Sequence, residues 1–383
     1  MKLDNIKFIL NKLKSKYVVL AALVLGILFM SSCSAADPQG STASGGDDKL
    51  QIVTTIFPPY DFARNIAGRN ADVSMLLKPG TESHSYEPSP SDIIKIMNCD
   101  IFIYTGGESD TWVDEILDSI SENGRDIRII KMLDVVDNAV EEEIVEGMQA
   151  GLLELNEHSE EEAASEIGGS GNGGGEDTAR ERSEEDGSNA AAEGSDEHEH
   201  ETESEHAHEY DEHVWTSPRR AMQIVDAISN AVIELDPDNI DEYQMNTAIY
   251  LSLLSDLDQE YREAIESSKR DYIVFGDRFP FRYLADEYGL KYSAAFPGCS
   301  SESEPSAKTV AYLIDRVREE EIPAVFYIEF SNQKIADAIA EETGAKKLLL
   351  HSCHNLTSEQ MNNGVTYLDL MRDNLENLKE ALN

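Results

Sequence analysis

The sequence is short of cysteine and of basic side chains, and each shortage excludes a class of protein. Four cysteines in 383 residues are too few for a disulfide scaffold. The 31 Lys and Arg residues face 75 Asp and Glu residues, which gives a formal net charge of -44. Such an acidic surface repels phosphates, so we expect no nucleic-acid partner. The charge suits a protein that attracts cations, although acidic blocks are also common in solvated tails.

An apolar, uncharged run at residues 17–30 has the character of a signal-peptide core. A basic segment precedes it and small residues follow, so we expect a secretory signal over residues 1–32. The letters MSSC are similar to a bacterial lipobox and predict lipidation of Cys33, with ordinary cleavage near Ala35 as the alternative. Residues 33–49 are rich in Ser, Gly and Ala and would form a flexible tether. We therefore expect the mature chain on the extracellular face of the cytoplasmic membrane, held by its lipid.

Strand-like runs alternate with amphipathic segments on both sides of the middle of the chain. Strands are expected at 50–56, 73–77, 100–104, 272–275, 292–296, 324–328 and 347–350. Helices are expected at 62–67, 91–98, 112–120, 218–235, 281–288, 306–319, 333–342 and 367–382. This alternation predicts an α/β protein with mostly parallel sheets, arranged as two Rossmann-like lobes.

A continuous helical pattern over 237–268 separates the two series of strands. It predicts one long rigid helix that joins an N-terminal lobe, 50–236, to a C-terminal lobe, 269–383. Ligands of such folds bind beyond the carboxyl ends of the strands, so we expect the site in the cleft between the lobes. Within the first lobe, residues 141–212 are dominated by Glu, Gly, Ser and Ala, which predicts a disordered acidic insertion.

Eight of the nine histidines fall into two groups, and His158 stands alone in the insertion. One group lies in a His/Glu-rich tract of the insertion, which is typical of weak metal collection: His198, His200, His206 and His208. The other group follows expected strands or segment junctions: His84, His213, His351 and His354, of which His351 and His354 could instead have supporting or surface roles. Imidazoles at the strand ends of two lobes are candidate ligands for Zn, Cu, Ni or Fe.

Four motifs occur in order along the chain: TTIFPPYDFARNIAG, PGTESHSYEPSPSDI, DEHVWTSPRRA and SESEPS. In this order and spacing they resemble the zinc/manganese solute-binding proteins of bacterial ABC importers, the long-helix type known as cluster A-I. The resemblance runs from about Gln51 to the C-terminus. It implies a lipoprotein, not an enzyme, that captures the ion between two lobes and delivers it to a membrane permease and its ATPase. It also implies a monomer.

The resemblance carries over to individual residues. His84 and His213 match the two histidine ligands of the family's first lobe. Arg278 stands where the family has its third histidine, and an always-charged guanidinium cannot bind a metal. His351 stands at the family's fourth, carboxylate position. These matches imply a metal site of His84, His213 and His351.

The fourth ligand stays open between water, Glu82 and Asp277. Arg278 would then pair with a carboxylate, for which Glu329 and Asp277 are candidates. Three imidazoles and one further ligand suit tetrahedral Zn²⁺, whereas Mn²⁺ calls for more oxygen ligands. We therefore expect Zn²⁺ as the cargo and Mn²⁺ as the weaker candidate.

Two cysteines each follow an expected second-lobe strand, Cys299 and Cys353. In an exported protein this placement predicts a disulfide between them, with metal-binding thiolates as the alternative.

Two other functions compete with metal delivery. A secreted zinc-dependent hydrolase would need a general base and a substrate pocket, and the sequence has no H-E-x-x-H motif. An acidic metal-binding surface adhesin, active in cell adhesion, would need no closed metal site.

Overall fold

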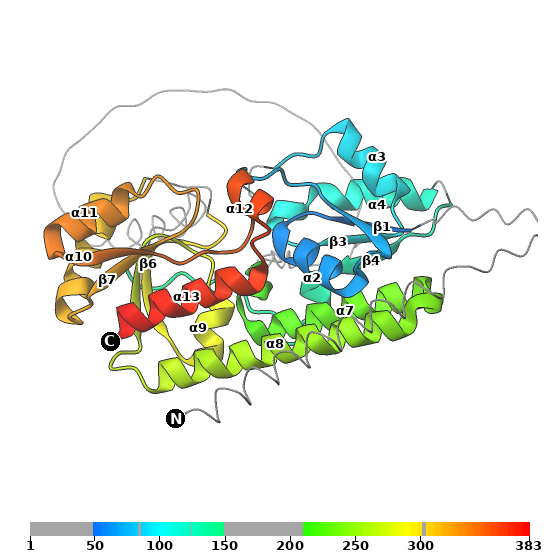
Figure 1. Ribbon diagram of the computed structural model, residues 1–383. Helices are drawn as coiled ribbons and strands as arrows, with labels where there is room; N and C mark the ends of the chain where they lie inside the picture. Colours follow the sequence, from blue (N-terminus) through cyan, green and yellow to red (C-terminus); the bar gives the residue numbers. More distant parts are fainter. Residues whose placement is uncertain (1–48, 83–85, 123, 149–209, 301–303) are drawn as a thin grey trace, which may run out of the picture. The chain divides into compact units, whose positions relative to one another are not determined.

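The computed structural model describes residues 49–82, 86–122, 124–148, 210–300 and 304–383. Two four-stranded sheets organise these residues, and every strand pairing within them is parallel (Figure 1). The first has the order β2-β1-β3-β4: β1 (Leu50–Thr54), β2 (Ala71–Met75), β3 (Ile101–Tyr104) and β4 (Arg128–Lys131). The second has the order β6-β5-β7-β8: β5 (Tyr272–Phe279), β6 (Lys291–Pro297), β7 (Ala324–Tyr327) and β8 (Lys346–Leu349). The expected pair of α/β lobes is confirmed.

Helices connect the strands in both lobes. In the first lobe they are α2 (Phe57–Ala67), α3 (Pro90–Asn98), η1 (Glu108–Asp110), α4 (Trp112–Glu122), α5 (Met132–Val135), η2 (Val214–Thr216) and α7 (Pro218–Leu235). After η3 (Pro237–Asn239) and the long α8 (Ile240–Glu266), the second lobe has α9 (Arg282–Tyr288), α10 (Ala307–Glu319), α11 (Lys334–Thr343), α12 (Ser358–Asn363) and α13 (Tyr367–Leu382). Within the described residues, no helix has the length and apolar character that crossing a membrane requires.

Helix α8 packs against both lobes. It contacts α2 and α7 of the first lobe, and α9 and α13 of the second (Figure 1). Two buried tyrosines of α8 add hydrogen bonds to the apolar contacts that this helix makes with the two lobes. The Tyr250 hydroxyl donates to the Asp61 carboxylate on α2, over 3.1 Å, and the Tyr261 hydroxyl donates to the Met371 carbonyl on α13, over 2.7 Å. This helix is therefore a shared strut rather than a flexible linker.

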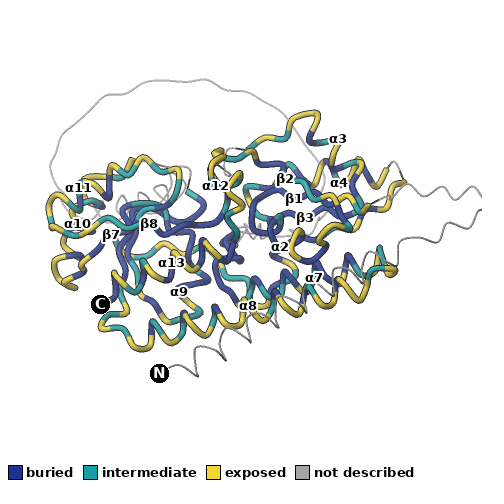
Figure 2. The backbone as a smooth tube through the Cα atoms, in the orientation of Figure 1, coloured by how far each residue is buried: buried dark blue, intermediate teal, exposed yellow. Residues whose placement is uncertain are grey.

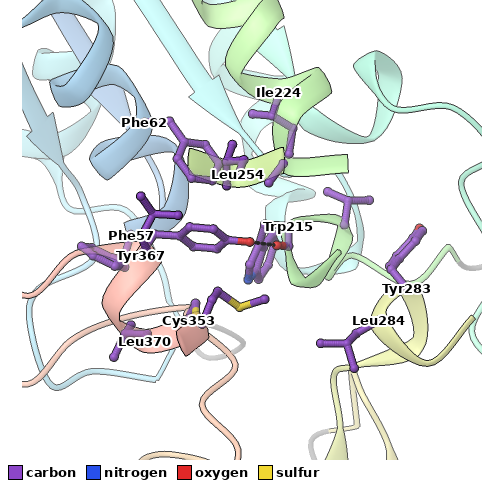
Figure 3. Close-up of a cluster of buried hydrophobic side chains, with 14 of the residues drawn as sticks. Phe57, Phe62, Trp215, Ile224, Leu254, Tyr283, Leu284, Cys353, Tyr367 and Leu370 are labelled. Carbon is purple, nitrogen blue, oxygen red and sulfur yellow. Dashed lines mark hydrogen bonds between the residues drawn. The ribbon is translucent and has the colours of Figure 1, made fainter. Parts of the chain in front are cut away.

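One continuous hydrophobic core extends from the first lobe into the second. Buried residues concentrate in the strands and on the inner sides of the helices, and exposed residues lie on the outer turns (Figure 2). Trp215 and Tyr367, from different lobes, meet inside this core, where the Tyr367 hydroxyl donates to the Trp215 carbonyl over 2.6 Å (Figure 3). The lobes are thus joined by packed side chains next to the candidate site.

The predicted disordered insertion, 141–212, includes residues at both of its ends that the structure describes as part of the fold. Residues 141–148 and 210–212 belong to the described structure, and Glu141 and Tyr210 form an antiparallel bridge. Asp211 and Glu212 are only 2% exposed, because backbone N–H groups of the fold bind their carboxylates. Composition alone did not reveal these partners. The segment 149–209, with His198, His200, His206 and His208, lies outside the described residues, as do the signal and Cys33.

Candidate metal centre

His213 lies just before η2 and is fully buried. Its Nδ1 lies 2.8 Å from Oδ1 of Asp211, which also accepts the His213 backbone N–H. Because a carboxylate can only accept, the Nδ1 atom carries the proton, and in the neutral ring Nε2 carries the lone pair. Burial lowers the pKa of His213, but the charges of Asp211, Glu212 and Glu142 outweigh it and raise the pKa above its usual range.

His354 lies against His213, with ring centroids 4.7 Å apart and ring planes nearly perpendicular. Its Nδ1 is 2.7 Å from the Ser352 hydroxyl, and that hydroxyl donates its own proton to the Glu329 carboxylate. Ser352 therefore accepts from His354, which again leaves the lone pair on Nε2. Metal-binding histidines commonly donate their second ring N–H to a fixed acceptor, which leaves the other nitrogen to the ion.

His351 has the opposite hydrogen bonding. The Cys353 backbone N–H donates to His351 Nδ1 over 3.0 Å, so Nδ1 supplies the lone pair and Nε2 carries the proton. The His351 backbone is bound on both sides by the Asn374 amide. The structure thus brings His354 to His213, whereas the ring of His351 accepts a backbone N–H within its own loop.

The post-β8 segment, residues 350–357, is part of the second lobe in sequence but is bound to the first lobe. The Trp215 indole N–H donates to the Ser352 carbonyl over 2.7 Å, and the Gly80 N–H donates to the Leu356 carbonyl over 2.7 Å. The buried Asn355 amide donates to the carbonyls of Lys78 and Thr81, over 2.7 and 2.9 Å. These bonds fasten His354 beside the loop that leads towards His84.

A cavity of about 20 Å³ adjoins His354, large enough for roughly one water molecule or ion. It is lined by Glu82, Arg278, Gly298 and Glu329, among others. Gly298 also contacts the other histidine, since a Cβ there would stand 3.1 Å from Cε1 of His213 and 3.0 Å from the Phe279 carbonyl oxygen. A larger residue at this position would fit only if His213 or Phe279 shifted by a few tenths of an ångström.

Each charged side chain discussed for this cavity has a partner within the protein. Arg278 Nη1 lies 3.0 Å from Glu82 Oε1, an ion pair between the lobes, and also donates to the Ser300 carbonyl. Glu329 accepts the backbone N–H and the hydroxyl of Ser352. The sequence named Glu329 and Asp277 as partners for Arg278; the guanidinium pairs with Glu82 instead.

Asp277 does not line this cavity. Its carboxylate accepts the N–H groups of Arg278 and Ile328, and burial raises its pKa. Cys299 and Cys353 are both buried and both free, so the predicted disulfide is not formed in the structure. Burial raises the pKa of both thiols, most strongly by desolvation, which also disfavours metal-binding thiolates.

His84 lies outside the described residues. Among the described residues, no group of three or more His, Cys, Asp or Glu side chains is placed to hold a metal ion. The described residues bring together two imidazoles, His213 and His354, a residue type that is a common ligand of Zn²⁺. The sequence analysis did not identify Ser352 or Asn355 as residues of the site. A usable signal for Ser352 was its place two positions before His354, because Asp211 stands two positions before His213 in the same way.

Comparisons with known proteins agree with this chemistry. The high-affinity zinc uptake system protein ZnuA of Bacillus subtilis is 33% identical over 356 residues, which are 93% of this chain and 94% of that protein. The zinc-binding lipoprotein AdcA of Streptococcus pneumoniae is 31% identical over 357 residues, and the chain spans only 60% of its length. The crystal structure of the Zn(II)-bound ZnuA-like domain of that AdcA matches with a TM-score of 0.60 and 28% identity, over 87% of this chain and 99% of that one.

A family model described as zinc-uptake complex component A, periplasmic, matches residues 52–381. This match confirms the resemblance that the four motifs indicated. It covers both lobes, the long helix and both histidines of the described centre. The family consists of solute-binding components of transporters and is not a family of enzymes. The chain therefore belongs to the ZnuA family of zinc-uptake solute-binding proteins.

Proposed function

We propose that the chain is the extracytoplasmic zinc-binding component of a metal ABC importer. The observation that carries this proposal is the contact between His213 and His354, each held through Nδ1 and each presenting its lone pair on Nε2. Such an arrangement is suited to holding an ion through two imidazole nitrogens. The cargo is Zn²⁺, because two or more imidazoles with few available carboxylates match its preference better than that of Mn²⁺.

His84 is the proposed third ligand, on the strength of its motif. The described residues on either side of it, Glu82 and Tyr86, line two different cavities, and His354 lines both. Both residues that flank the segment of His84 therefore lie near His354. Water is the proposed fourth ligand, since Glu82 is engaged by Arg278 and Asp277 by backbone N–H groups.

The proposal extends to the anchoring of the chain, its oligomeric state, its partners and its lack of hydrolase activity. The mature chain is anchored to the outer face of the cytoplasmic membrane through a lipid on Cys33, and it acts as a monomer. It delivers zinc to the permease and ATPase of the importer. It acts as a binding protein and not as a hydrolase, since the cavity beside His354 is the size of about one water molecule or ion.

The test is a zinc titration of the mature, metal-free protein against a competing chelator. One tight equivalent is expected for the wild type, and it should be lost in His213→Ala and His354→Ala. Removing the insertion histidines together serves as the control, since it should leave that equivalent in place. A wild-type protein without tight zinc binding contradicts the proposed function, and tight binding that survives both alanine variants contradicts the site.

A further inference from the structure

Arg278 occupies a position beside the metal centre where a positive charge opposes a bound cation. It follows an irregularity in the β5–β6 pairing between Phe275 and Arg278, and such a bulge re-aims the side chains near the end of a strand. The result is a guanidinium that lines the cavity beside His354, with its side chain only 17% exposed. A guanidinium so close to the proposed zinc site repels the ion, so its presence there calls for an explanation.

The cavity contains carboxylates that would otherwise be suitable metal ligands. Glu82 enters from the first lobe and Glu329 from the second. Both are already bound: Glu82 to Arg278 Nη1 at 3.0 Å, and Glu329 to the backbone N–H of Ser352 at 2.7 Å and to its hydroxyl. Each carboxylate beside His354 therefore has an internal partner that competes with a metal ion for its oxygen atoms.

We propose that Arg278 determines the metal specificity of this site by holding Glu82 away from the ion. The inference rests on the proposed function and adds a reason for its selectivity. With Glu82 paired, the ion meets imidazole nitrogens and water, a set that favours Zn²⁺ over Mn²⁺. With Glu82 released, the same cavity offers a carboxylate oxygen, which is the kind of ligand that raises the affinity for Mn²⁺.

A second role for the ion pair must be separated from the first. Because Glu82 and Arg278 come from different lobes, the pair also holds the lobes together. Loss of that role alone would weaken binding of every metal by the same factor. A specificity role changes the ratio of the two affinities, so the ratio is the quantity to measure.

The experiment compares four full-length, metal-free variants: Arg278→Met, Arg278→Lys, Glu82→Gln, and the double variant Arg278→Met with Glu82→Gln. Zinc affinity is measured by chelator competition and manganese affinity by the spin-resonance signal of free Mn²⁺. The visible spectrum of bound Co²⁺ reports whether an oxygen ligand has been added. Arg278→Met should shift the ratio of affinities towards Mn²⁺ by at least about tenfold, the scale typical of residues that tune metal ligands.

Arg278→Lys keeps a positive charge near Glu82 and should restore most of the wild-type ratio. The double variant should also return towards that ratio, because the released carboxylate is gone. An unchanged ratio in Arg278→Met, or an equal loss for both metals, overturns the proposal. So does a shift that persists in the double variant.

Glu82→Gln keeps an oxygen that can accept from Arg278 and tests the proposal even if Arg278→Met does not fold. Its zinc affinity should fall far less than that of His354→Ala. A loss as large as that of His354→Ala makes Glu82 a zinc ligand and overturns the inference. Failure of wild-type zinc binding is a different result, because it contradicts the proposed function itself.

Discussion

The backbone N–H of Phe57 donates a hydrogen bond of 3.0 Å to the carbonyl oxygen of His354. Phe57 begins α2 of the first lobe, whereas His354 follows the last strand of the second. A histidine supplied by one lobe is therefore fixed on the other. His213 and His354 are thus both bonded to the first lobe, whereas Arg278 and Gly298 belong to the β5–β6 part of the second.

Asn355 should be as important for this attachment as a buried core residue. Its fully buried amide is shared between the carbonyls of Lys78 and Thr81. Asn355→Ala removes both bonds and leaves the carbonyls without that donor, so we expect a loss of about 1–3 kcal/mol in the free energy of unfolding. Urea denaturation of the metal-free protein measures this loss.

The matched control for Asn355 is Asn98→Ala. Asn98 also donates its amide to a carbonyl, that of Ile94, but at an exposed position. Its loss should cost much less, because water can replace the donor. Equal losses in the two variants would show that Asn355 does not secure the loop. Zinc affinity should fall in Asn355→Ala and stay unchanged in Asn98→Ala.

The two histidines of the post-β8 segment should behave differently on substitution. His354→Gln should reduce zinc affinity by more than the roughly 10- to 100-fold typical of residues that only orient ligands. His351→Gln should keep tight zinc binding and lose stability instead, because the His351 ring accepts the Cys353 N–H inside the fold. Zinc competition and urea denaturation on the same samples separate the effects. If His351→Gln loses zinc while His354→Gln retains it, our choice of ligand is wrong.

The sequence predicted helices best where a capping residue marks the boundary. Helices α7 and α13 have the expected limits, and each begins after a hydroxyl side chain, Ser217 or Thr366, that accepts a backbone N–H. Helix α2 begins at Phe57, earlier than expected, since Pro58 and Pro59 lie in its first turn, where missing N–H groups cost little. The short β4 and α5 were missed because four residues carry too little periodicity.

The sequence indicated the segments of the candidate site, and its choice of ligands stays a prediction. His213 was expected from its motif. The choice of His354 over His351 depends on how the backbone turns between these two residues. Cys353 has a φ of 65°, which turns the chain between the two rings, and a non-glycine residue rarely signals such a turn. The pairing of Arg278 with Glu82 joins residues 196 positions apart, which no local pattern reveals.

Deletion of residues 149–209 should leave the metal centre intact. The Asp211 N–H donates to the Val140 carbonyl over 2.9 Å, and Glu141 and Tyr210 form a bridge, so the fold itself joins the two sides of the insertion at residues 140–141 and 210–211. A Gly/Ser linker from Met148 to Tyr210 can therefore replace the segment. Isothermal titration should show one tight zinc equivalent in both forms, with weaker equivalents lost from the shortened one. Loss of the tight equivalent would place a primary ligand in the insertion.

Reducing agent should have no effect on the stability of the folded protein. Cys99, Cys299 and Cys353 are buried and free, and burial raises the pKa of Cys99 to about 12. Thiolates are then scarce as well as inaccessible, so a thiol reagent should label these three only after unfolding. Labelling rates in native buffer and in urea provide the measurement. A drop in stability on reduction would instead indicate the disulfide between Cys299 and Cys353 that the sequence suggested.

Asp110 should make the metal-free protein less stable as the pH rises from 4 to 7. Burial raises its pKa to about 6, against the opposing effect of the Gly106 N–H, with Glu212 raising it further. The folded state therefore keeps a proton on Asp110 that the unfolded chain has already released, and stability falls as pH rises through this interval.

Asp110→Asn cannot titrate, so its stability relative to the wild type should increase from pH 4 to pH 7, by up to about 3 kcal/mol. Urea denaturation across this range, in the presence of a chelator, isolates the effect because the other titrating groups are common to both proteins. Asp114→Asn is the matched control, since Asp114 is exposed and lines the same cavity as Asp110. A pH-independent difference between Asp110→Asn and the wild type, or an equal slope in Asp114→Asn, would show that the buried Asp110 carboxylate does not carry this penalty.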